Sequence, residues 1–490
     1  MLCRRQDSLA MTKSLLPLWM LTAVICLLWL PLLLAQGMFV DGVFDALFAH
    51  NLVQGITTFW NPHSVGYSKP EYWDNPPLSM YLLSLWFRVF GDYFWSERVY
   101  SLSCALGQFA LVTGVWRSYF YDCYLIKKYF WLPLFLLLCC PIIEWCYSNN
   151  LMENTMSIFT TASVLIFVLF LKRNWNLFVS ASLSGILIFL AIISKGPVGL
   201  FPLVAPICFM LGRNRFNFNK MALYTSIQAA IFGAVFFVTF SMHEAGNFLR
   251  HYLDLQLLPA LHNPESNALL HWPILNQLFW AALPMLSLAI ISICIFPKKL
   301  LKNIMLREAL IFIAIAFCAS LPILLSAKQH RYYLLPSFPF YAMGFACVIV
   351  PLVQFVFEFG SRFWCTFLER VYQGACVLCI GISIALCVAN TNEIARDRAI
   401  LMDIQDIQEF LKNEKLISAE PKLYYAWILR AYLNRMHDQK LCMPNEVVTS
   451  EFFMTEHGTR GIILPKGARK IYSGQTIDLY NRPIQRKEPS

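Results

Sequence analysis

The chain has 490 residues, of which 58% are hydrophobic and only 14% are charged. Soluble domains carry roughly 45–50% apolar and about 25% charged residues, so this composition excludes a soluble enzyme, a disordered protein and a nucleic-acid binder. The formal net charge of +10 indicates orientation in a membrane, because membrane proteins concentrate Lys and Arg in their inner loops.

Several segments are apolar enough and long enough to cross a bilayer as helices, for which about 20 residues are needed. These predicted spans cover 15–36, 99–116, 129–147, 153–171, 175–193, 197–212, 221–242, 272–296, 308–326, 333–357 and 371–389. One shorter apolar stretch, from Pro77 to Gly91, contains Arg88 and fits either a short span or a helix lying at the membrane interface.

The distribution of basic residues decides how this short stretch is placed. If Pro77–Gly91 does not cross, the basic N-terminus and every strongly basic later loop lie on the inner side, as the positive-inside bias favours. The sequence therefore predicts an all-α polytopic membrane protein with about 11 transmembrane helices, one interfacial helix and an external C-terminal tail.

The tail is charged and mixed in pattern, unlike the rest of the chain. We predict a transmembrane domain over 1–392, with a first outer loop at 37–98, and a small C-terminal α/β extracytoplasmic domain over 393–490. Apolar spacing within the tail favours particular elements. The predicted helices are Ala399–Glu414 and one around Tyr432–Met436, and the predicted strands are Lys422–Ala426, Gly461–Leu464 and Thr476–Tyr480.

The predicted topology brings polar residues from separate parts of the chain to the outer face. Charged side chains at membrane depth are costly and usually functional. Simple structural roles also fit several of them: Asp74 precedes a helix that Asn75 would cap and Pro76 would start, and Glu153 suits a first helical turn. Gly42 would allow a turn after Asp41. Lys195 stands out because few other charges lie so tightly between apolar runs.

Two further cations, Lys328 and Arg331, lie at the expected start of an outgoing helix, where they would oppose the helix dipole. A bound phosphate would remove that conflict, because Arg binds phosphate through two parallel hydrogen bonds and Lys binds it as a point charge. At this depth the phosphate would belong to a lipid. The sequence has no Walker loop, dinucleotide glycine fingerprint or paired CxxC, which argues against an energy-coupled pump and a redox protein.

Six motifs occur in a characteristic order over about residues 15–345. They are Val40–Ala46 after the first span, Asp74–Leu78 with a helix ending at Phe90–Gly91, Glu97–Arg98, Leu151–Glu153, Ser194–Leu200 and Arg331–Pro336. In this order the chain resembles the bacterial membrane glycosyltransferases of the ArnT and protein-O-mannosyltransferase type, which have the GT-C fold and use a polyprenyl-phosphate sugar as donor.

The resemblance implies an active site at the outer membrane face and assigns roles to individual residues. Asp41, Asp74 and Glu153 would be catalytic. The substrate-binding residues would be Lys195, Lys328, Arg331, Tyr332, Tyr72, Asn75 and Asp45. No cofactor is demanded by the sequence itself; a divalent metal held by Asp74 and His251 is left open. Two phosphate-binding cations of the family are replaced here by Phe44 and Asn75, and Lys328, Arg331 or Arg250 are the candidates to substitute for them.

These assignments predict an inverting glycosyltransferase of a bacterial inner membrane, with its active site and tail facing the periplasm or exterior. It would transfer a sugar from a lipid-phosphate donor to a lipid A-like glycolipid, a glycan or a protein. Lys195 would neutralise the leaving phosphate and Asp41 would activate the acceptor hydroxyl. Two alternatives stay open: a secondary transporter of an anionic solute, and a polysaccharide polymerase or ligase.

Overall fold

The computed structural model describes residues 2–62, 74–212, 218–262, 272–295, 304–326, 328–359, 362–411, 414–444, 450–459, 464–465 and 467–481. The chain divides into two compact units. The first comprises residues 1–33, 73–79 and 101–390, and the second comprises residues 34–72, 80–100 and 391–490. Each unit is described by itself.

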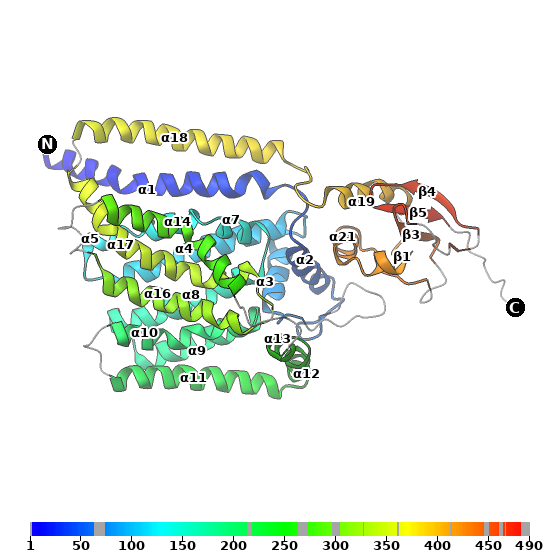
Figure 1. Ribbon diagram of the computed structural model, residues 1–490, viewed down its shortest axis with the longest axis horizontal. Coiled ribbons are helices and arrows are strands. Elements are labelled where there is room, and N and C mark those ends of the chain that lie inside the picture. The colour runs from blue at the N-terminus through cyan, green and yellow to red at the C-terminus, as the bar shows by residue number, and fades with distance from the viewer. Residues whose placement is uncertain are drawn as a thin grey trace. The chain divides into compact units, whose positions relative to one another are not determined.

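The first unit is helical. Its long helices are α1 (Leu2–Leu33), α4 (Ser96–Tyr119, from residue 101 onward), α8 (Met152–Arg173), α9 (Leu177–Ser194), α11 (Phe218–Ser241), α14 (Trp272–Ile295), α16 (Leu306–Ser320), α17 (Phe338–Phe359) and α18 (Arg362–Ala389). Short elements connect them: α5 (Tyr124–Lys127), α6 (Trp131–Leu138), α7 (Pro141–Ser148), η1 (Pro197–Val204), α10 (Ala205–Gly212), α12 (His243–Tyr252), η2 (Leu253–Leu257), α13 (Leu258–His262), η3 (Leu321–Leu325) and η4 (Arg331–Ser337). In Figure 1, α8, α9 and α11 run side by side, as do α16 with α17 and α1 with α18.

The helices confirm a multi-pass membrane protein, because only structures that satisfy their own backbone hydrogen bonds can cross lipid. Within the described residues, eight helices are long and apolar enough to span a bilayer. The predicted segment 129–147 is a pair of helices bent by 77°, which would make a ninth span if the pair counts as one. The predicted spans 15–36 and 197–212 correspond to shorter apolar helices, Pro17–Leu33 and Pro197–Gly212.

Polar side chains join neighbouring helices in the interior of this unit. Ser163 Oγ of α8 lies 2.7 Å from Ser184 Oγ of α9, and Gln228 of α11 donates a hydrogen bond to the same Ser184 hydroxyl at 2.7 Å. A Cβ at Gly185 would lie 2.6 Å from the Gln228 carbonyl oxygen, so only glycine allows this close approach of α9 and α11. Small residues and interhelical hydrogen bonds are the usual means of packing helices in membranes.

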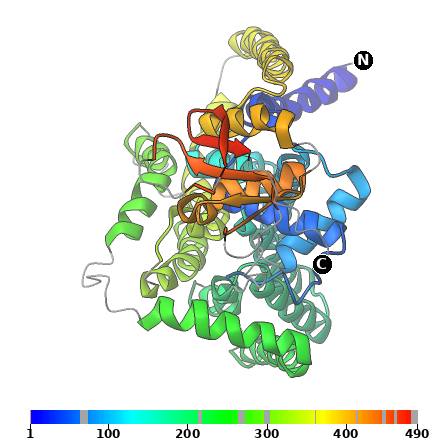
Figure 2. The same cartoon turned by 90° about the vertical axis from the view of Figure 1, so that its right-hand side faces the viewer.

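The second unit combines helices with a sheet. Its helices are α2 (Val40–Val53), α3 (Leu78–Phe90, from residue 80 onward), α19 (Arg398–Leu411), α20 (Pro421–Tyr424) and α21 (Trp427–His437). Its strands are β1 (Leu416–Ala419), β2 (Lys440–Cys442), β3 (Phe452–Glu456), β4 (Arg469–Ser473) and β5 (Ile477–Asn481). The sheet has the order β2-β1-β3-β5-β4, parallel at β1 with β2 and β3 and antiparallel at β5 with β3 and β4. Figure 2 shows this sheet in orange and red.

One face of the sheet packs against α19 and α21. Alternate residues of a strand point to the same face, and Phe452 with Met454 of β3 and Ile477 with Leu479 of β5 enter the same core cluster. That cluster continues through the buried apolar residues of the two helices. The tail is therefore a folded α/β structure, as predicted.

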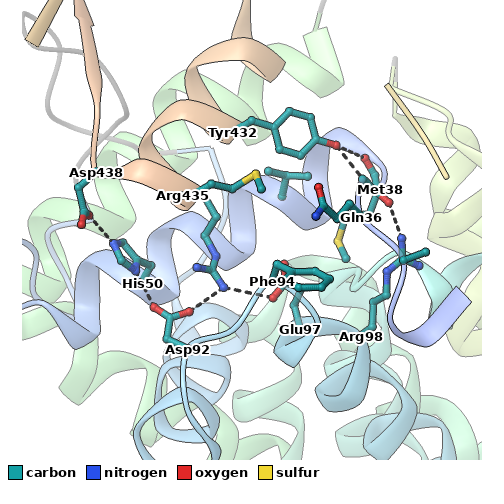
Figure 3. A pocket seen from close by; sticks show the side chains of 14 residues that line it. Gln36, Met38, His50, Asp92, Phe94, Glu97, Arg98, Tyr432, Arg435 and Asp438 are labelled. Carbon is teal, nitrogen blue, oxygen red and sulfur yellow. Dashed lines mark hydrogen bonds and ion pairs between the residues drawn. The ribbon is translucent and has the colours of Figure 1, made fainter. Parts of the chain in front are cut away.

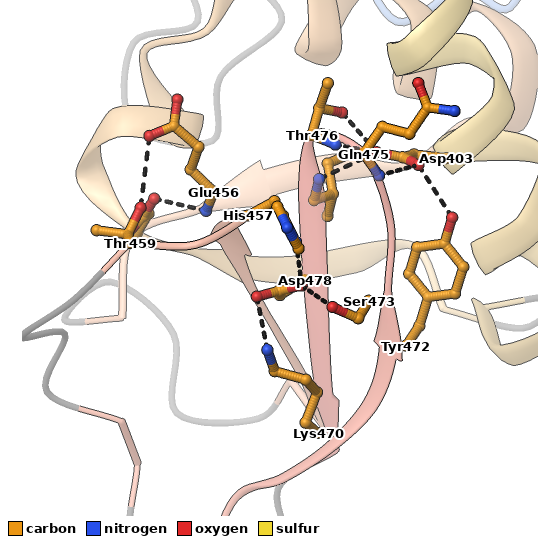
Figure 4. A network of polar contacts seen from close by, with 12 residues as sticks. Asp403, Glu456, His457, Thr459, Lys470, Tyr472, Ser473, Gln475, Thr476 and Asp478 are labelled. Carbon is orange, nitrogen blue, oxygen red and sulfur yellow. Dashed lines mark hydrogen bonds and ion pairs between the residues drawn. The ribbon is translucent and has the colours of Figure 1, made fainter.

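Networks of polar contacts stabilise the β5–β4 edge of this sheet (Figure 4). Asp403 of α19 accepts hydrogen bonds from the backbone amides of Gln475, Thr476 and Ile477, which hold the β4–β5 turn against the helix. These hydrogen bonds to the carboxylate outweigh the effect of burial and lower the pKa of Asp403. Asp478 is similarly held by Lys470 at 2.7 Å.

Some local predictions in the tail are correct and others are wrong. Helices α19 and α21 confirm those expected around 399–414 and 432–436, and β5 confirms the strand expected at 476–480. The strand predicted at Lys422–Ala426 is wrong, because Pro421 starts the short helix α20 there. The predicted strand Gly461–Leu464 lies almost wholly outside the described residues.

Two predictions near the first outer loop are also wrong. No turn occurs at Gly42, because α2 begins at Val40 and runs through that glycine. The helix after the Pro-Pro motif begins at Leu78 rather than at Pro76, so Asn75 does not occupy its N-cap position. The described part of the first outer loop contains two helices: α2, which was not predicted, and α3, which corresponds to the predicted interfacial helix over Pro77–Gly91.

Candidate active site

A buried charged pair in the helical unit joins two predicted site residues. Glu153 lies in the first turn of α8, and Lys195 directly follows α9. The Lys195 ammonium lies 3.4 Å from Glu153 Oε1, and the two side chains are 13% and 1% exposed. A buried carboxylate is stable as an anion only when it is paired or well hydrogen-bonded. Lys195 therefore supplies the cation that stabilises the buried Glu153 carboxylate.

The backbone after Lys195 and its aromatic neighbours fix the position of the ammonium. Gly196 has φ +134°, and a Cβ there would lie 2.5 Å from the Tyr252 hydroxyl. That hydroxyl donates a hydrogen bond to the Lys195 carbonyl at 3.5 Å, and burial raises the pKa of Tyr252 to about 12, so the tyrosine stays neutral. The Lys195 ammonium also lies 5.6 Å from the centre of the Tyr333 ring, a cation–π geometry.

A second cation, Lys328, is linked to Asp74 through the side-chain amide of Gln256. Lys328 Nζ donates a hydrogen bond to Gln256 Oε1 at 2.7 Å, and Gln256 Nε2 donates one to Asp74. Gln256 lies in the π-helical turn η2, a geometry that is rare and frequent at functional sites. Surrounding atoms desolvate the Asp74 carboxyl and raise its pKa although the side chain still reaches solvent, while Lys328, Gln256 and Lys195 act in the opposite direction.

The predicted aromatic and basic residues of the 328–336 segment form one stack. Arg331 lies 4.6 Å from the centre of the Trp145 ring, and Tyr332 stacks on that same ring at 5.8 Å. The His330 ring in turn stacks on the Tyr332 ring, with the ring centres 5.2 Å apart and an interplanar angle of 1°. Arg331 itself is exposed, so its guanidinium packs against the Trp145 ring while the residue stays accessible to solvent.

The remaining predicted residues are placed separately. Asp41 lies half-buried in the first turn of α2, and Asp45 is buried one turn later; both belong to the second unit. Asn75 follows Asp74 in the loop before α3. Tyr72 lies outside the described residues. Arg250 packs over the Phe240 ring at 5.4 Å.

The described surroundings of Asp74 offer no argument for a metal. Among the residues that the structure describes, no group of three or more His, Cys, Asp or Glu side chains is placed to hold a metal ion. The His251 imidazole Nδ1 donates to the Asn247 carbonyl at 2.8 Å. The described groups that act on Asp74 are the Gln256 amide and the Lys328 and Lys195 ammonium ions, which do not fit a divalent cation. The metal role of Asp74 and His251 stays a prediction.

Sequence reasoning missed four residues that shape this site: Gln256, Tyr252, Tyr333 and Trp145. Tyr333 could have been found because it follows Arg331 and Tyr332 in one motif. Gln256 and Tyr252 carry no signal in the sequence, since an outer-loop Gln or Tyr is common and their contacts join residues far apart in the chain, such as the 182 positions between Gln256 and Asp74.

Comparisons with known proteins agree with the fold. No protein-family model and no curated protein matches this sequence. A crystal structure of ArnT from Cupriavidus metallidurans bound to undecaprenyl phosphate has a TM-score of 0.68 at 13% identity, over 96% of this chain and 99% of that one. The same protein in the apo state has a TM-score of 0.64 at 14% identity, over 94% and 97%.

An oligosaccharyltransferase from Archaeoglobus fulgidus is similar at a lower level. Its apo crystal structure has a TM-score of 0.50 at 10% identity, over 89% of this chain and 69% of that one. Identities this low establish architecture only. The chain therefore has the ArnT-like GT-C fold that its motifs predicted.

Proposed function

We propose that this protein is an integral membrane glycosyltransferase. It transfers a sugar from a polyprenyl-phosphate donor to an envelope acceptor, which is a lipid A-like glycolipid, a glycan or a protein, at the outer face of a bacterial inner membrane. The observation that carries the proposal is a pair of lysines from distant segments of the helical unit, each held by an acid: Lys195 by Glu153 at 3.4 Å, and Lys328 through Gln256 by Asp74. The fold shared with a structure that binds undecaprenyl phosphate supports it.

Two lysines suit the leaving group of this reaction. As the bond between the anomeric carbon and the phosphate oxygen breaks, negative charge grows on the leaving polyprenyl phosphate. Lys195 and Lys328 would stabilise that charge at a site partly shielded from water, where fixed cations are most effective. Arg331 is a further cation on the same segment as Lys328, and it suits two-fold contact with phosphate oxygens.

Asp41 would serve the acceptor. Its carboxylate would take the proton of the acceptor hydroxyl as the acceptor oxygen forms its bond to the anomeric carbon. Attack opposite the departing phosphate inverts the anomeric configuration. Glu153 would hold Lys195, and Asp74 would orient Lys328 through Gln256, so these two acids would act on the cations of the site.

An anion transporter is the alternative that the same lysines permit. Transporters of this kind usually bind substrate near the bilayer midplane between repeated halves. Here Lys195 follows the end of α9 and Lys328 precedes the start of η4, so neither lysine interrupts a span. These positions favour transfer from a lipid held at the membrane surface.

Mass spectrometry of total lipids tests the proposal directly. Cells that lack the gene are compared with cells that carry the wild-type gene and with cells that carry Lys195→Ala. We expect a polyprenyl-monophosphate sugar to accumulate in the deletion strain and with Lys195→Ala, and one glycoconjugate to lose the corresponding sugar mass. Unchanged lipid-linked sugars under conditions of verified expression would reject the transferase and favour the transporter.

A further inference from the structure

The α2 helix, which carries Asp41 in its first turn, shares a hydrophobic core with the C-terminal tail. Val43 of α2 and Met38 just before it belong to the same buried cluster as the residues of α19, α21 and the sheet. The Phe44 ring lies 5.7 Å from the ring of Trp427 in α21. Residues about 390 positions later in the chain therefore cover the end of α2 that carries Asp41, as Tyr432 does at Met38. Farther along α2, Ala46 and Ala49 pack against Leu83 and Phe87 of α3 instead.

The backbone just before Asp41 is fixed by hydrogen bonds at consecutive residues. Tyr432 Oη accepts a hydrogen bond from the Met38 amide at 3.2 Å and lies 3.3 Å from the Met38 carbonyl oxygen. Arg98 donates to the Gly37 carbonyl. Gly37 has φ +80°, and a Cβ there would clash with the Arg396 carbonyl at 2.3 Å, so the tail and this turn fit without room for a side chain.

Charged residues form a clamp at the other end of α2. His50 Nδ1 lies 2.5 Å from Asp92, and His50 Nε2 lies 2.8 Å from Asp438, directly after α21. Arg435 of α21 lies 2.6 Å from Asp92 and 3.3 Å from Glu97. Figure 3 shows these residues pointing toward one another. They line a cavity of about 300 Å³.

The clamp sets two cationic side chains against three carboxylates, so it joins the elements electrostatically. Burial alone would lower the pKa of His50, but the hydrogen bonds to Asp92 and Asp438 outweigh it and raise the pKa, which favours the charged imidazolium. The imidazolium and the Arg435 guanidinium then face the carboxylates of Asp92, Glu97 and Asp438. Removing a single member of a buried charge network is strongly destabilising, because the remaining charges are then left buried without their partner.

We propose that the C-terminal tail is a positioning element for the reaction, in which Tyr432 and Arg435 of α21 hold α2 at both ends and so fix the direction of the Asp41 carboxylate. This inference rests on the proposed function, because it gives the tail a role in orienting the acceptor base. Neither residue is catalytic; Tyr432 acts through the backbone just before α2, and Arg435 acts through Asp92, which contacts His50 of α2.

The test uses the full-length protein in lipid nanodiscs and the donor identified in the deletion strain. Tyr432→Phe removes the hydroxyl that bonds to the Met38 backbone and to the Asp397 carboxylate. Arg435→Met removes the guanidinium while keeping an apolar stem. The matched control is Tyr472→Phe, which removes a tail hydroxyl that bonds to Asp403 and Asp406 instead. Arg435→Lys is the conservative variant that keeps a cation.

We expect kcat to fall about 10-fold to 100-fold in Tyr432→Phe and Arg435→Met, because misplacement of a catalytic group by about 1 Å has an effect of this size. The affinity for undecaprenyl phosphate, used as the probe of the phosphate site, should change by less than about twofold. Tyr472→Phe should retain wild-type kcat, and Arg435→Lys should recover part of the loss. Unchanged kcat in both variants, or equal losses of kcat and of undecaprenyl phosphate affinity, would overturn the inference.

Hydrogen–deuterium exchange separates this inference from the proposed function. Even if the wild-type protein transfers no sugar, Tyr432→Phe and Arg435→Met should speed exchange in residues 36–53 while Tyr472→Phe does not. Faster exchange without any wild-type transfer would reject the proposed function and keep the link between tail and α2. Wild-type exchange in all three variants would reject the link itself. If Arg435→Met fails to accumulate, Asp438→Asn, at the exposed end of the clamp, replaces it in these measurements.

Discussion

The buried pair of Lys195 and Glu153 gives the sharpest energetic prediction. With the ammonium 3.4 Å from the carboxylate oxygen, Coulomb's law at an effective dielectric constant of about 20 gives an attraction of about 5 kcal/mol. Part of this attraction offsets the desolvation of two charges, so the pair contributes less than that to the free energy of unfolding. Removing one partner is more damaging, because a nearly fully buried carboxylate then loses its nearby cation.

We therefore expect Lys195→Met to lower the free energy of unfolding by about 3–5 kcal/mol, the range for breaking a buried pair. Glu153→Gln should lower it by a similar amount. The double variant should lose about 2–3 kcal/mol less than the sum of the two, because the second change removes the charge that the first left behind. A double variant that stays folded would be unable to stabilise the donor phosphate.

The assay is thermal and SDS-induced unfolding of the purified protein in one detergent, together with sugar transfer by each variant. Asp122→Asn is the control: Asp122 is 74% exposed and lies 3.6 Å from Lys172, and exposed pairs contribute only about 0–1 kcal/mol. Strictly additive losses in the double variant would refute the reasoning, since the two side chains would then act independently. A folded double variant with wild-type transfer would remove both residues from the mechanism.

Three further predictions concern the acceptor base, the donor cations and the tail. Asp41→Asn should abolish transfer while the undecaprenyl phosphate affinity of the purified protein stays unchanged; full transfer would remove Asp41 from the mechanism. Lys328→Gln and Gln256→Met should raise the KM for the donor by about 10-fold, the size of one lost charge-assisted contact of about 1.4 kcal/mol, and an unchanged KM in steady-state assays would contradict the role of this contact. The pKa of Asp478 is lowered to about 2, so its stabilising contribution is complete above the ordinary pKa of about 3.9 and is lost as the pH falls toward 2. Limited proteolysis of the full-length protein across that range should show the β4–β5 hairpin opening, and Asp478→Asn should open it already at neutral pH.

Composition and local pattern determined the membrane architecture. Apolar runs of about 20 residues must become helices in lipid, because no water is present to satisfy exposed backbone groups. That constraint is local in the chain, so the long helices and the existence of an α3 helix after the Pro-Pro motif could be read from the sequence. Lys195 and Glu153 were recognisable for a related reason, since charges between apolar runs are costly and rarely retained without a function.

The tertiary structure decided which of these residues meet and how the tail is used. The strands of the tail are three to five residues long, so the sequence pattern identified β5 but not β1, β2, β3 or β4. The parallel pairing of β1 with β2 and β3 depends on contacts between distant segments. The expected boundary at 393 marks where the composition changes, whereas the compact unit also takes in 34–72 and 80–100. Apolar burial is non-directional, so a sequence shows that Met38 and Val43 prefer to be buried but not that Tyr432 and the core of the tail will cover them. Only the folded chain brings together groups separated by hundreds of residues, as it does for Gln256 with Asp74 and for His50 with Asp438.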